Sequence, residues 1–428
     1  MRLRQMFHPG LPRQVIIQLT EHCNASCPQC GMRASQPGAR RRLSLDTARR
    51  ILDTAAEEGV GIVSLTGGEP FLHFDDVVAL LRYAGSLGIP FLRTGTNGFW
   101  LSDEPSRVAD RIAELASSPV RNFWISLDSA EPRVHEQLRG LPGLIRSLEK
   151  NLPRFHAWGL YPAANLGLNR LIGGKETEHL RLEPEPDPAA IAAFYQGYCR
   201  AFRGYLNLIL DLGFTLVNAC YPMGLEEGGQ APVYAAASAD AIMDYNRVER
   251  QWLLQAWQDT VPEFRGRVRI FSPRVSLQAL VRQHAGRTPA PYPCLGGSHF
   301  FFISARDHLT YACGYLPDSL GPFWEKRWKT NPPGDCRACD WECFRDPSEL
   351  LGFARHSWRD PRGWLRRLRS DYPYFRMWLR DLRYFLASDF FDGRKPPRLD
   401  RLRAAAEADL FARKAPLCPG GFLQSRKR

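Results

Sequence analysis

The stretch Cys23-Asn24-Ala25-Ser26-Cys27-Pro28-Gln29-Cys30 places three cysteines within eight residues, directly after the apolar run 15–19. Thiolates are soft ligands, and three of them on one loop can hold an iron-sulfur cluster while one iron stays open to a further ligand. A zinc site is the alternative, but zinc sites usually combine close pairs of cysteines from two segments. The next cysteine in the chain is Cys199, so the spacing favours an iron-sulfur cluster.

Outward from this loop, residues 15–221 alternate short apolar runs with amphipathic stretches, which predicts βα units around a parallel sheet. The predicted strands are 15–20, 61–65, 89–94, 122–127, 163–168 and 215–220, and a helix is expected at 74–86. We also expect that a helix at 239–258 and a short strand at 268–271 lead out of the barrel. Six such units indicate an α/β fold with a partial, open (β/α)6 barrel. The motif Gly67-Gly68-Glu69-Pro70 follows the second strand, at the strand end where barrels of this kind place their sites. A tight strand-to-helix turn would explain the glycines but not Glu69, whose carboxylate can accept hydrogen bonds from an ammonium group.

The C-x3-C-x2-C spacing and Thr66-Gly67-Gly68-Glu69-Pro70, in this order, resemble the radical S-adenosylmethionine (radical SAM) superfamily and its Gly-Gly-Glu-Pro motif. The resemblance implies that Cys23, Cys27 and Cys30 hold a catalytic [4Fe-4S] cluster, and that the open iron binds S-adenosylmethionine (SAM). It assigns Gly67, Gly68, Glu69 and Pro70 to the amino group of SAM. It also implies an external electron donor such as flavodoxin or ferredoxin, and cleavage of SAM to a 5′-deoxyadenosyl radical that abstracts hydrogen from substrate. Gln29 departs from the family, which usually has an aromatic residue there, near the adenine.

Three weaker motifs follow later predicted strands, and they resemble the family's further elements in their order. Asn97 lies in Thr96-Asn97-Gly98, Ser126 and Asp128 lie in Ser126-Leu127-Asp128, and Arg139 lies in Leu138-Arg139-Gly140. The resemblance makes these four residues candidate contacts of the cofactor or the substrate. For Arg139, an ordinary surface arginine is the alternative.

A second group of cysteines lies in residues 294–343, around a predicted hairpin at 299–303 and 309–312. Four thiolates suffice for a fully ligated cluster or for a structural zinc ion. The layout resembles the SPASM or twitch extensions of radical SAM enzymes, which carry an auxiliary [4Fe-4S] cluster, although His308 stands where the hairpin glycine is usual. The resemblance implies the ligands Cys294, Cys313, Cys336 and Cys339, with Cys343 as the competing fourth.

The 428 residues, 44% hydrophobic and 24% charged, are ordinary for a globular chain of two or three domains. We expect an N-terminal extension at 1–14, the radical SAM partial barrel at 15–222, and a barrel-mouth loop with a linking helix at 223–290. A small auxiliary-cluster region follows at 291–346, and a basic, aromatic helical extension at 347–428.

No apolar run reaches about 18 residues and no signal peptide precedes the first strand, which predicts a cytoplasmic enzyme. The formal charge of +12 would suit an anionic substrate, a membrane surface or nucleic acid. No RNA-binding or helix-turn-helix pattern accompanies it, so we do not expect nucleic acid. Beyond residue 347, Trp364, Arg366, Arg369 and Trp378 would suit peripheral contact with the inner face of the membrane, but a core-facing helix is favoured.

These observations predict a radical SAM enzyme, with oxidoreductase or lyase-type chemistry, that abstracts hydrogen from a small-molecule or lipid-linked substrate. Its basic charge favours an anionic one. The alternatives are a peptide- or protein-modifying maturase, and a non-catalytic iron-sulfur or zinc scaffold or redox sensor. Peptide maturases often carry a leader-binding domain before the barrel, and the 14 residues before the first strand lead us to expect none here.

Overall fold

The computed structural model describes residues 14–30, 40–222, 240–287, 292–330, 340–359 and 371–410, together with the single positions 238, 336, 362, 365, 368 and 369. In these residues one sheet has the strand order β10-β9-β8-β1-β2-β3-β4-β5-β6-β7, and its two end strands do not pair with each other. Neighbours from β8 through β1 to β7 are parallel. The predicted α/β fold with a partial, open barrel is confirmed.

The six strands predicted for the barrel begin and end within two residues of their expected positions. They are β1 (Gln14–Thr20), β2 (Ile62–Gly67), β3 (Phe91–Thr96), β4 (Val120–Ser126), β5 (Ala163–Gly167) and β6 (Leu216–Cys220). We expected the strand at 268–271 to lead out of the barrel, and this is wrong: β7 (Arg269–Phe271) extends the sheet beside β6. The predicted hairpin exists as β8 (Phe300–Ile303) and β9 (Leu309–Tyr311), followed by β10 (Ser319–Pro322). It joins the sheet because β8, buried along its whole length, pairs with β1.

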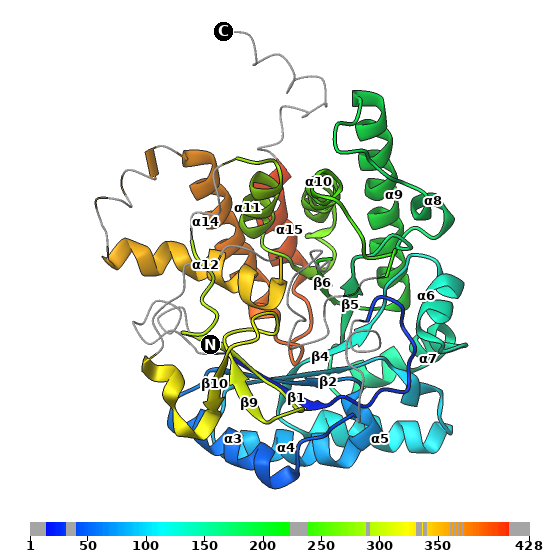
Figure 1. Cartoon of the computed structure of the whole chain (residues 1–428). Helices are drawn as coiled ribbons and strands as arrows, with labels where there is room; N and C mark the ends of the chain where they lie inside the picture. The colour runs from blue at the N-terminus through cyan, green and yellow to red at the C-terminus, as the bar shows by residue number, and fades with distance from the viewer. Residues whose placement is uncertain are drawn as a thin grey trace.

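Helices connect the parallel strands, and Figure 1 shows α3, α4 and α5 along the outer side of the curved sheet. Those of the barrel are α3 (Leu45–Glu57), α4 (Phe74–Ser86), α5 (Pro105–Ser117), α6 (Pro132–Arg139), α7 (Leu144–Ala157), α8 (Lys175–Glu178) and α9 (Pro188–Leu212). In α3 the Ser44 side chain caps the first turn by accepting a hydrogen bond from the Thr47 N–H. The apolar positions at helical spacing, Ala48, Ile51, Leu52 and Ala55, are buried.

The later helices gather at the other side of the molecule (Figure 1). They are α10 (Arg247–Phe264), α11 (Arg274–His284), α12 (Glu342–Arg359), α14 (Tyr372–Ala387) and α15 (Leu399–Leu410). We expected a helix at 239–258, but α10 begins later because Asn246 and Glu249 form a capping box.

The apolar side of α14 faces the protein. Trp378 is 6% exposed and its Nε1–H donates to the Leu350 carbonyl, 2.8 Å away. Deeper in the same interface, Arg265, which directly follows α10, and Asp381 of α14 form a fully buried ion pair of 2.9 Å. The core-facing alternative is thus confirmed for α14. Trp364 and Arg366 lie outside the described residues, and no described helix is long and apolar enough to cross a membrane.

Residues 389–395, after α14, pack against the N-terminal ends of the barrel strands. The Gly393 N–H donates to the Arg121 carbonyl (2.6 Å), and the Gly393 carbonyl accepts from the Tyr161 N–H (2.7 Å). Phe390 and Phe391 have φ values of 55° and 58°, a left-handed conformation that costs a non-glycine residue about 1–2 kcal/mol. The C-terminal extension therefore supplies the floor of the barrel.

Candidate functional site

The cysteine loop leaves the C-terminal end of β1 and lines one end of a cavity of about 880 Å³ inside the barrel. Cys23, Cys27 and Cys30 all line this cavity, as the spacing predicts for ligands of one group. The Ala25 N–H donates to Cys23 Sγ at 3.4 Å. Burial raises the pKa of Cys23 to about 11 and also raises the pKa of Cys27. Because thiolates are the ligand form, a bound cation would have to stabilise the deprotonated sulfurs.

Gly67 and Gly68 hold this loop against the end of β2. A Cβ at Gly67 would lie 2.6 Å from the Thr20 carbonyl oxygen, and one at Gly68 would lie 2.3 Å from the His22 carbonyl oxygen. The close approach is fixed by hydrogen bonds from Gly68 N to Thr20 O (2.7 Å) and from Glu69 N to His22 O (2.8 Å). The two glycines are therefore needed for contact between two backbone segments, whether or not they also approach a ligand.

The carboxylate of Glu69 is 1% exposed and surrounded by donors. Its Oε1 accepts from Phe71 N–H (2.9 Å) and the Thr96 hydroxyl (2.8 Å), and its Oε2 accepts from Asn97 N–H (2.6 Å). Burial raises the pKa of Glu69 to about 7, against these hydrogen bonds. We expected that a strand-to-helix turn would not require Glu69, and this is wrong, because Glu69 caps the 3-10 turn Pro70–His73.

Asp128 and Arg139 lie at the same end of the cavity and contact each other. Arg139 Nε and Nη2 both lie 2.7 Å from Asp128 Oδ2, while Asp128 Oδ1 accepts from Gly167 N–H (3.1 Å). Burial opposes the charge on Arg139, but the Asp128 carboxylate raises its pKa overall. The surface-arginine alternative is wrong, since the Arg139 side chain is 14% exposed. Gln29, at the atypical position, donates from Nε2 to Asp128 Oδ2 (2.9 Å).

Asn97 and Ser126 also line the cavity beside the cysteine loop. Asn97 Nδ2 donates to Asn24 Oδ1 (3.0 Å) and lies 4.0 Å from Cys23 Sγ. Thus the structure brings together every predicted site residue of the barrel, from Cys23 to Arg139, around one end of one cavity.

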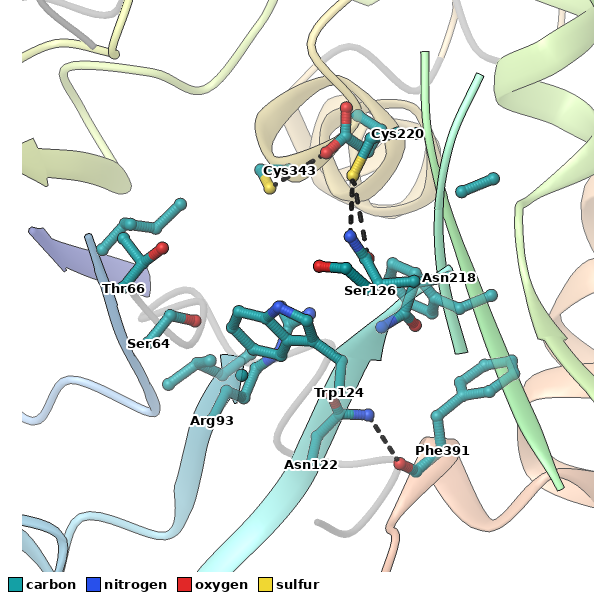
Figure 2. Close-up of a pocket in the computed structure, with 18 of the residues that line it drawn as sticks. Ser64, Thr66, Arg93, Asn122, Trp124, Ser126, Asn218, Cys220, Cys343 and Phe391 are labelled. Atoms are coloured by element: carbon teal, nitrogen blue, oxygen red, sulfur yellow. Dashed lines mark hydrogen bonds between the residues drawn. The ribbon is translucent and has the colours of Figure 1, made fainter. Parts of the chain in front are cut away.

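Deeper in the cavity lie polar residues that the sequence analysis missed (Figure 2). They include Arg93 of β3 and Trp124 of β4. Cys220, at the C-terminal end of β6, also lines the cavity. The available signal was Arg93 itself, because a charged residue is unusual within a strand that is otherwise buried on both faces of a parallel sheet. Trp124 stands over Gly95, where a Cβ would lie 2.0 Å from the indole Nε1.

Three of the second group of cysteines lie near one another. The Cys294 N–H donates to the Cys336 carbonyl (2.8 Å), and the thiols of Cys294, Cys313 and Cys336 interact electrostatically. Backbone N–H groups point at the sulfurs: Gly296 N–H donates to Cys294 Sγ, and Tyr315 and Leu316 N–H donate to Cys313 Sγ, each at 3.4 Å. Cys339 lies outside the described residues.

Cys343 belongs to different surroundings. Its Sγ donates to Glu342 Oε1 (3.3 Å), and Glu342 also lines the barrel cavity. Figure 2 shows Cys343 beside Cys220, which lines the same cavity. Cys220 in turn contacts the Asn165 amide, with Nδ2 3.5 Å from its sulfur. The side chain of Cys343 therefore faces the barrel cavity.

The donor sets suit iron-sulfur clusters chemically. The cysteine loop supplies three soft sulfur ligands to the lining of one cavity, which would leave one iron of a bound [4Fe-4S] cluster open. N–H donors aimed at sulfur, as at Cys23, Cys294 and Cys313, set the reduction potential of such clusters by hydrogen bonding to the ligand sulfurs. Among the described residues, no three His, Cys, Asp or Glu side chains converge as they would around a single metal ion.

Comparisons with known proteins show which families and structures the chain is similar to. Residues 17–178 match the family model described as "Radical SAM superfamily". The chain is 23% identical over 350 residues to an AdoMet-dependent heme synthase of Methanosarcina barkeri, covering 80% of this chain and 87% of that one. It is 31% identical over 134 residues to a PqqA peptide cyclase of Rhodopseudomonas palustris, covering 31% and 33%. Among solved structures, SuiB of Streptococcus suis bound to the precursor peptide SuiA matches with a TM-score of 0.49 and 14% identity, over 75% of this chain and 65% of that one.

Proposed function

The chain carries a radical SAM domain and is an enzyme of that superfamily, and from this premise we propose that it cleaves SAM reductively and abstracts hydrogen from a small anionic substrate in its barrel. The superfamily implies a [4Fe-4S] cluster and SAM as cofactors. The observation that carries the proposal is the convergence of Cys23, Cys27 and Cys30 with Glu69 and Asn97 at one end of the barrel cavity.

In this proposal Cys23, Cys27 and Cys30 are the ligands of the catalytic cluster. When bound, the cluster supplies the single electron for cleavage of SAM. An external donor such as flavodoxin or ferredoxin then returns one electron to the cluster in the cell. The chain's own residues position the cysteine loop and exclude water from the cavity. Gly67 and Gly68 let the loop sit against β2, and Asn97 fixes the loop through Asn24.

The roles of Gly67, Gly68, Glu69, Pro70, Asn97, Ser126, Asp128 and Arg139 as contacts of SAM or the substrate remain part of the proposal. Asp128 already pairs with Arg139, so it acts by orienting that guanidinium and Gln29. Glu69, with a pKa raised to about 7 by burial, exchanges a proton near neutral pH and can accept from an ammonium group when ionised.

For the second group we propose an auxiliary [4Fe-4S] cluster held by Cys294, Cys313, Cys336 and Cys339. Its support is the mutual proximity of the three described cysteines and their N–H contacts. Cys343 is the weaker candidate for the fourth ligand, because its thiol contacts Glu342 in the barrel cavity. A structural zinc ion is the alternative. Iron analysis distinguishes the two, because a zinc ion in this site would leave only the irons of the catalytic cluster.

The substrate class is the most specific part of the proposal. A cavity of about 880 Å³ falls within the range of small-molecule sites, and the basic chain favours an anionic ligand. The second candidate is a peptide-modifying enzyme, favoured by the relative named as a PqqA peptide cyclase. A lipid-linked substrate has less support, since the apolar side of α14 is buried.

The test uses anaerobically reconstituted protein with dithionite and SAM, and it measures 5′-deoxyadenosine. We expect product from the wild-type chain, and about eight irons per chain when both sites hold four-iron clusters. Cys27→Ala should lose the product and about four irons, whereas Cys199→Ala, a buried thiol outside the cavity, should keep both. Absence of 5′-deoxyadenosine with an intact cluster would leave the scaffold or sensor alternative. Replacing Glu69 does not separate these hypotheses, because Glu69 also caps a turn.

A further inference from the structure

One layer of the barrel interior lies below the proposed SAM site and is polar. Ser64 of β2, Arg93 of β3 and Asn122 of β4 are partners in the register of three neighbouring strands, and all three line the cavity. Adjacent strands lie about 4.8 Å apart, so the three side chains enter the cavity side by side. Figure 2 shows Ser64 and Arg93 on one side of Trp124 and Asn122 below it.

The guanidinium of Arg93 has no ion-pair or hydrogen-bond partner among the described residues. It interacts electrostatically with Cys343, Cys220 and Glu342, but no carboxylate of the described chain lies within 4.0 Å of it. The other charged side chains that line the cavity differ in this respect: Arg139 pairs with Asp128, and Arg121 with Asp392. Burial lowers the pKa of Arg93, because desolvation opposes its charge.

The neighbours of Arg93 add a donor and an apolar wall. Ser64 Oγ is buried and has no hydrogen-bond partner among the described residues. The ring of Trp124 lies 5.6 Å from the Arg93 guanidinium carbon, and it excludes water from one side of the charge. A partly desolvated guanidinium next to a free hydroxyl is an arrangement that binds carboxylate or phosphate groups, because such charge-assisted hydrogen bonds strengthen where water is excluded.

We propose that Ser64 and Arg93, walled by Trp124, bind a carboxylate or phosphate group of the substrate inside the barrel. This rests on the proposed function, since it names the substrate class of the same cavity. The site lies three residues before Thr96 on β3, about 10 Å along the strand from the end where the cysteine loop lies. Arg93 is thus a specificity-determining residue and has no part in holding the cluster.

The test measures binding of simple anions to the reconstituted holoenzyme, without SAM turnover. Thermal unfolding is followed while sodium phosphate or sodium succinate is titrated at ionic strength held constant with sodium chloride. We expect a saturable rise of the unfolding midpoint in the wild type. In Arg93→Gln the half-saturating concentration should rise about 10- to 100-fold, the ratio expected for the loss of a charged hydrogen bond. Response to phosphate alone assigns a phosphate, and response to succinate alone assigns a carboxylate.

Two further variants make the result decisive. Arg383→Gln removes an exposed arginine of α14 and one charge, and it should titrate like the wild type. Arg93→Lys keeps the charge without the planar fork of donors, and it should fall between the wild type and Arg93→Gln even if the glutamine variant folds poorly. A purely structural Arg93 would make Arg93→Gln less stable in anion-free buffer, whereas an unpaired buried charge predicts an equal or higher midpoint.

The inference is overturned if no anion gives a saturable shift, or if Arg93→Gln and the wild type respond alike. It is also overturned if Arg93→Gln is destabilised in the absence of anion while its anion response is unchanged. Because these readouts need no SAM cleavage, a failure to form 5′-deoxyadenosine would count against the proposed reaction and leave the anion site to be judged separately.

Discussion

Substituting Gly68 by alanine should separate the cysteine loop from the strand that supports it. A Cβ at this position would meet the backbone of His22, 2.3 Å from its carbonyl oxygen and 2.7 Å from its carbonyl carbon. Contacts of a real Cβ are ordinary only beyond 3.4 Å, so the loop must retreat by about 1 Å. Backbone cannot rotate away as the end of a flexible side chain can.

The cost follows from the contacts that this retreat breaks. Gly68 N donates to Thr20 O at 2.7 Å, and Glu69 N donates to His22 O at 2.8 Å. Each of these two bonds contributes about 1 kcal/mol net, and overpacking adds about 1–3 kcal/mol, so Gly68→Ala should lose about 3–5 kcal/mol of unfolding free energy. The same shift displaces Cys23, which follows His22 directly.

The assay compares urea unfolding of the apoprotein and the iron content after anaerobic reconstitution. Gly204→Ala is the matched control, because Gly204 lies in α9 and its added Cβ would meet only the Ala130 side chain at an ordinary 3.5 Å. This control should be neutral, or more stable by about 0.5–1 kcal/mol through helix propensity. We expect Gly68→Ala to lose about four irons per chain, those of the catalytic cluster. Full iron content with unfolding free energy within about 0.5 kcal/mol of the wild type would refute the argument.

Three further predictions test other parts of the structure. The pKa of Glu69 rises on folding from 4.5 to about 7, so apoprotein stability should fall by up to about 3 kcal/mol as pH rises through this window, and Glu69→Gln should flatten the pH profile measured by urea unfolding. Asp381→Ala removes the carboxylate of the buried ion pair with Arg265, so it should cost about 3–5 kcal/mol, and replacing both residues by leucine should restore most of the loss of thermal stability. Cys313→Ser should lower iron by about four per chain. Cys343→Ser should keep it, and equal loss from both would return Cys343 to the ligand set.

The strands of the barrel could be predicted because their apolar runs are bounded by clear turn residues. Residues 74–86 were expected to form a helix and do so as α4, whose buried positions recur at helical spacing. The partner of β8 could not be predicted in this way. The run Phe300–Ile303 indicates a fully buried strand, but pairing with β1, almost 300 residues earlier, depends on tertiary packing. A three-residue strand such as β7 gives too short a pattern to assign to the sheet.

The candidate site shows the same division between local and tertiary information. The cysteine loop and the Gly-Gly-Glu-Pro motif around Glu69 can each be recognised from a few adjacent residues. The resemblance of both motifs to one family therefore predicts that they lie at one site, as they do in the structure. Cys343 was grouped with the second set of cysteines because it lies four residues after Cys339. Its position in the first turn of α12 turns its thiol toward Glu342 and the barrel cavity instead, a direction set by the docking of the helix.

The charges along the cavity argue for one orientation of the substrate in our proposal. At the strand ends the carboxylates are satisfied, Glu69 by three donors and Asp128 by Arg139 and the Gly167 N–H. The deeper layer instead holds Arg93, whose charge has no ion-pair partner in the described chain. An anionic group is therefore attracted past the strand ends to Arg93, and the rest of the substrate extends back toward the cysteine loop. Since Arg93 lies about 10 Å along β3 from Thr96, the carbon that loses hydrogen should be several bonds away from the anionic group, and a very short carboxylate such as acetate should bind without reaching the strand ends.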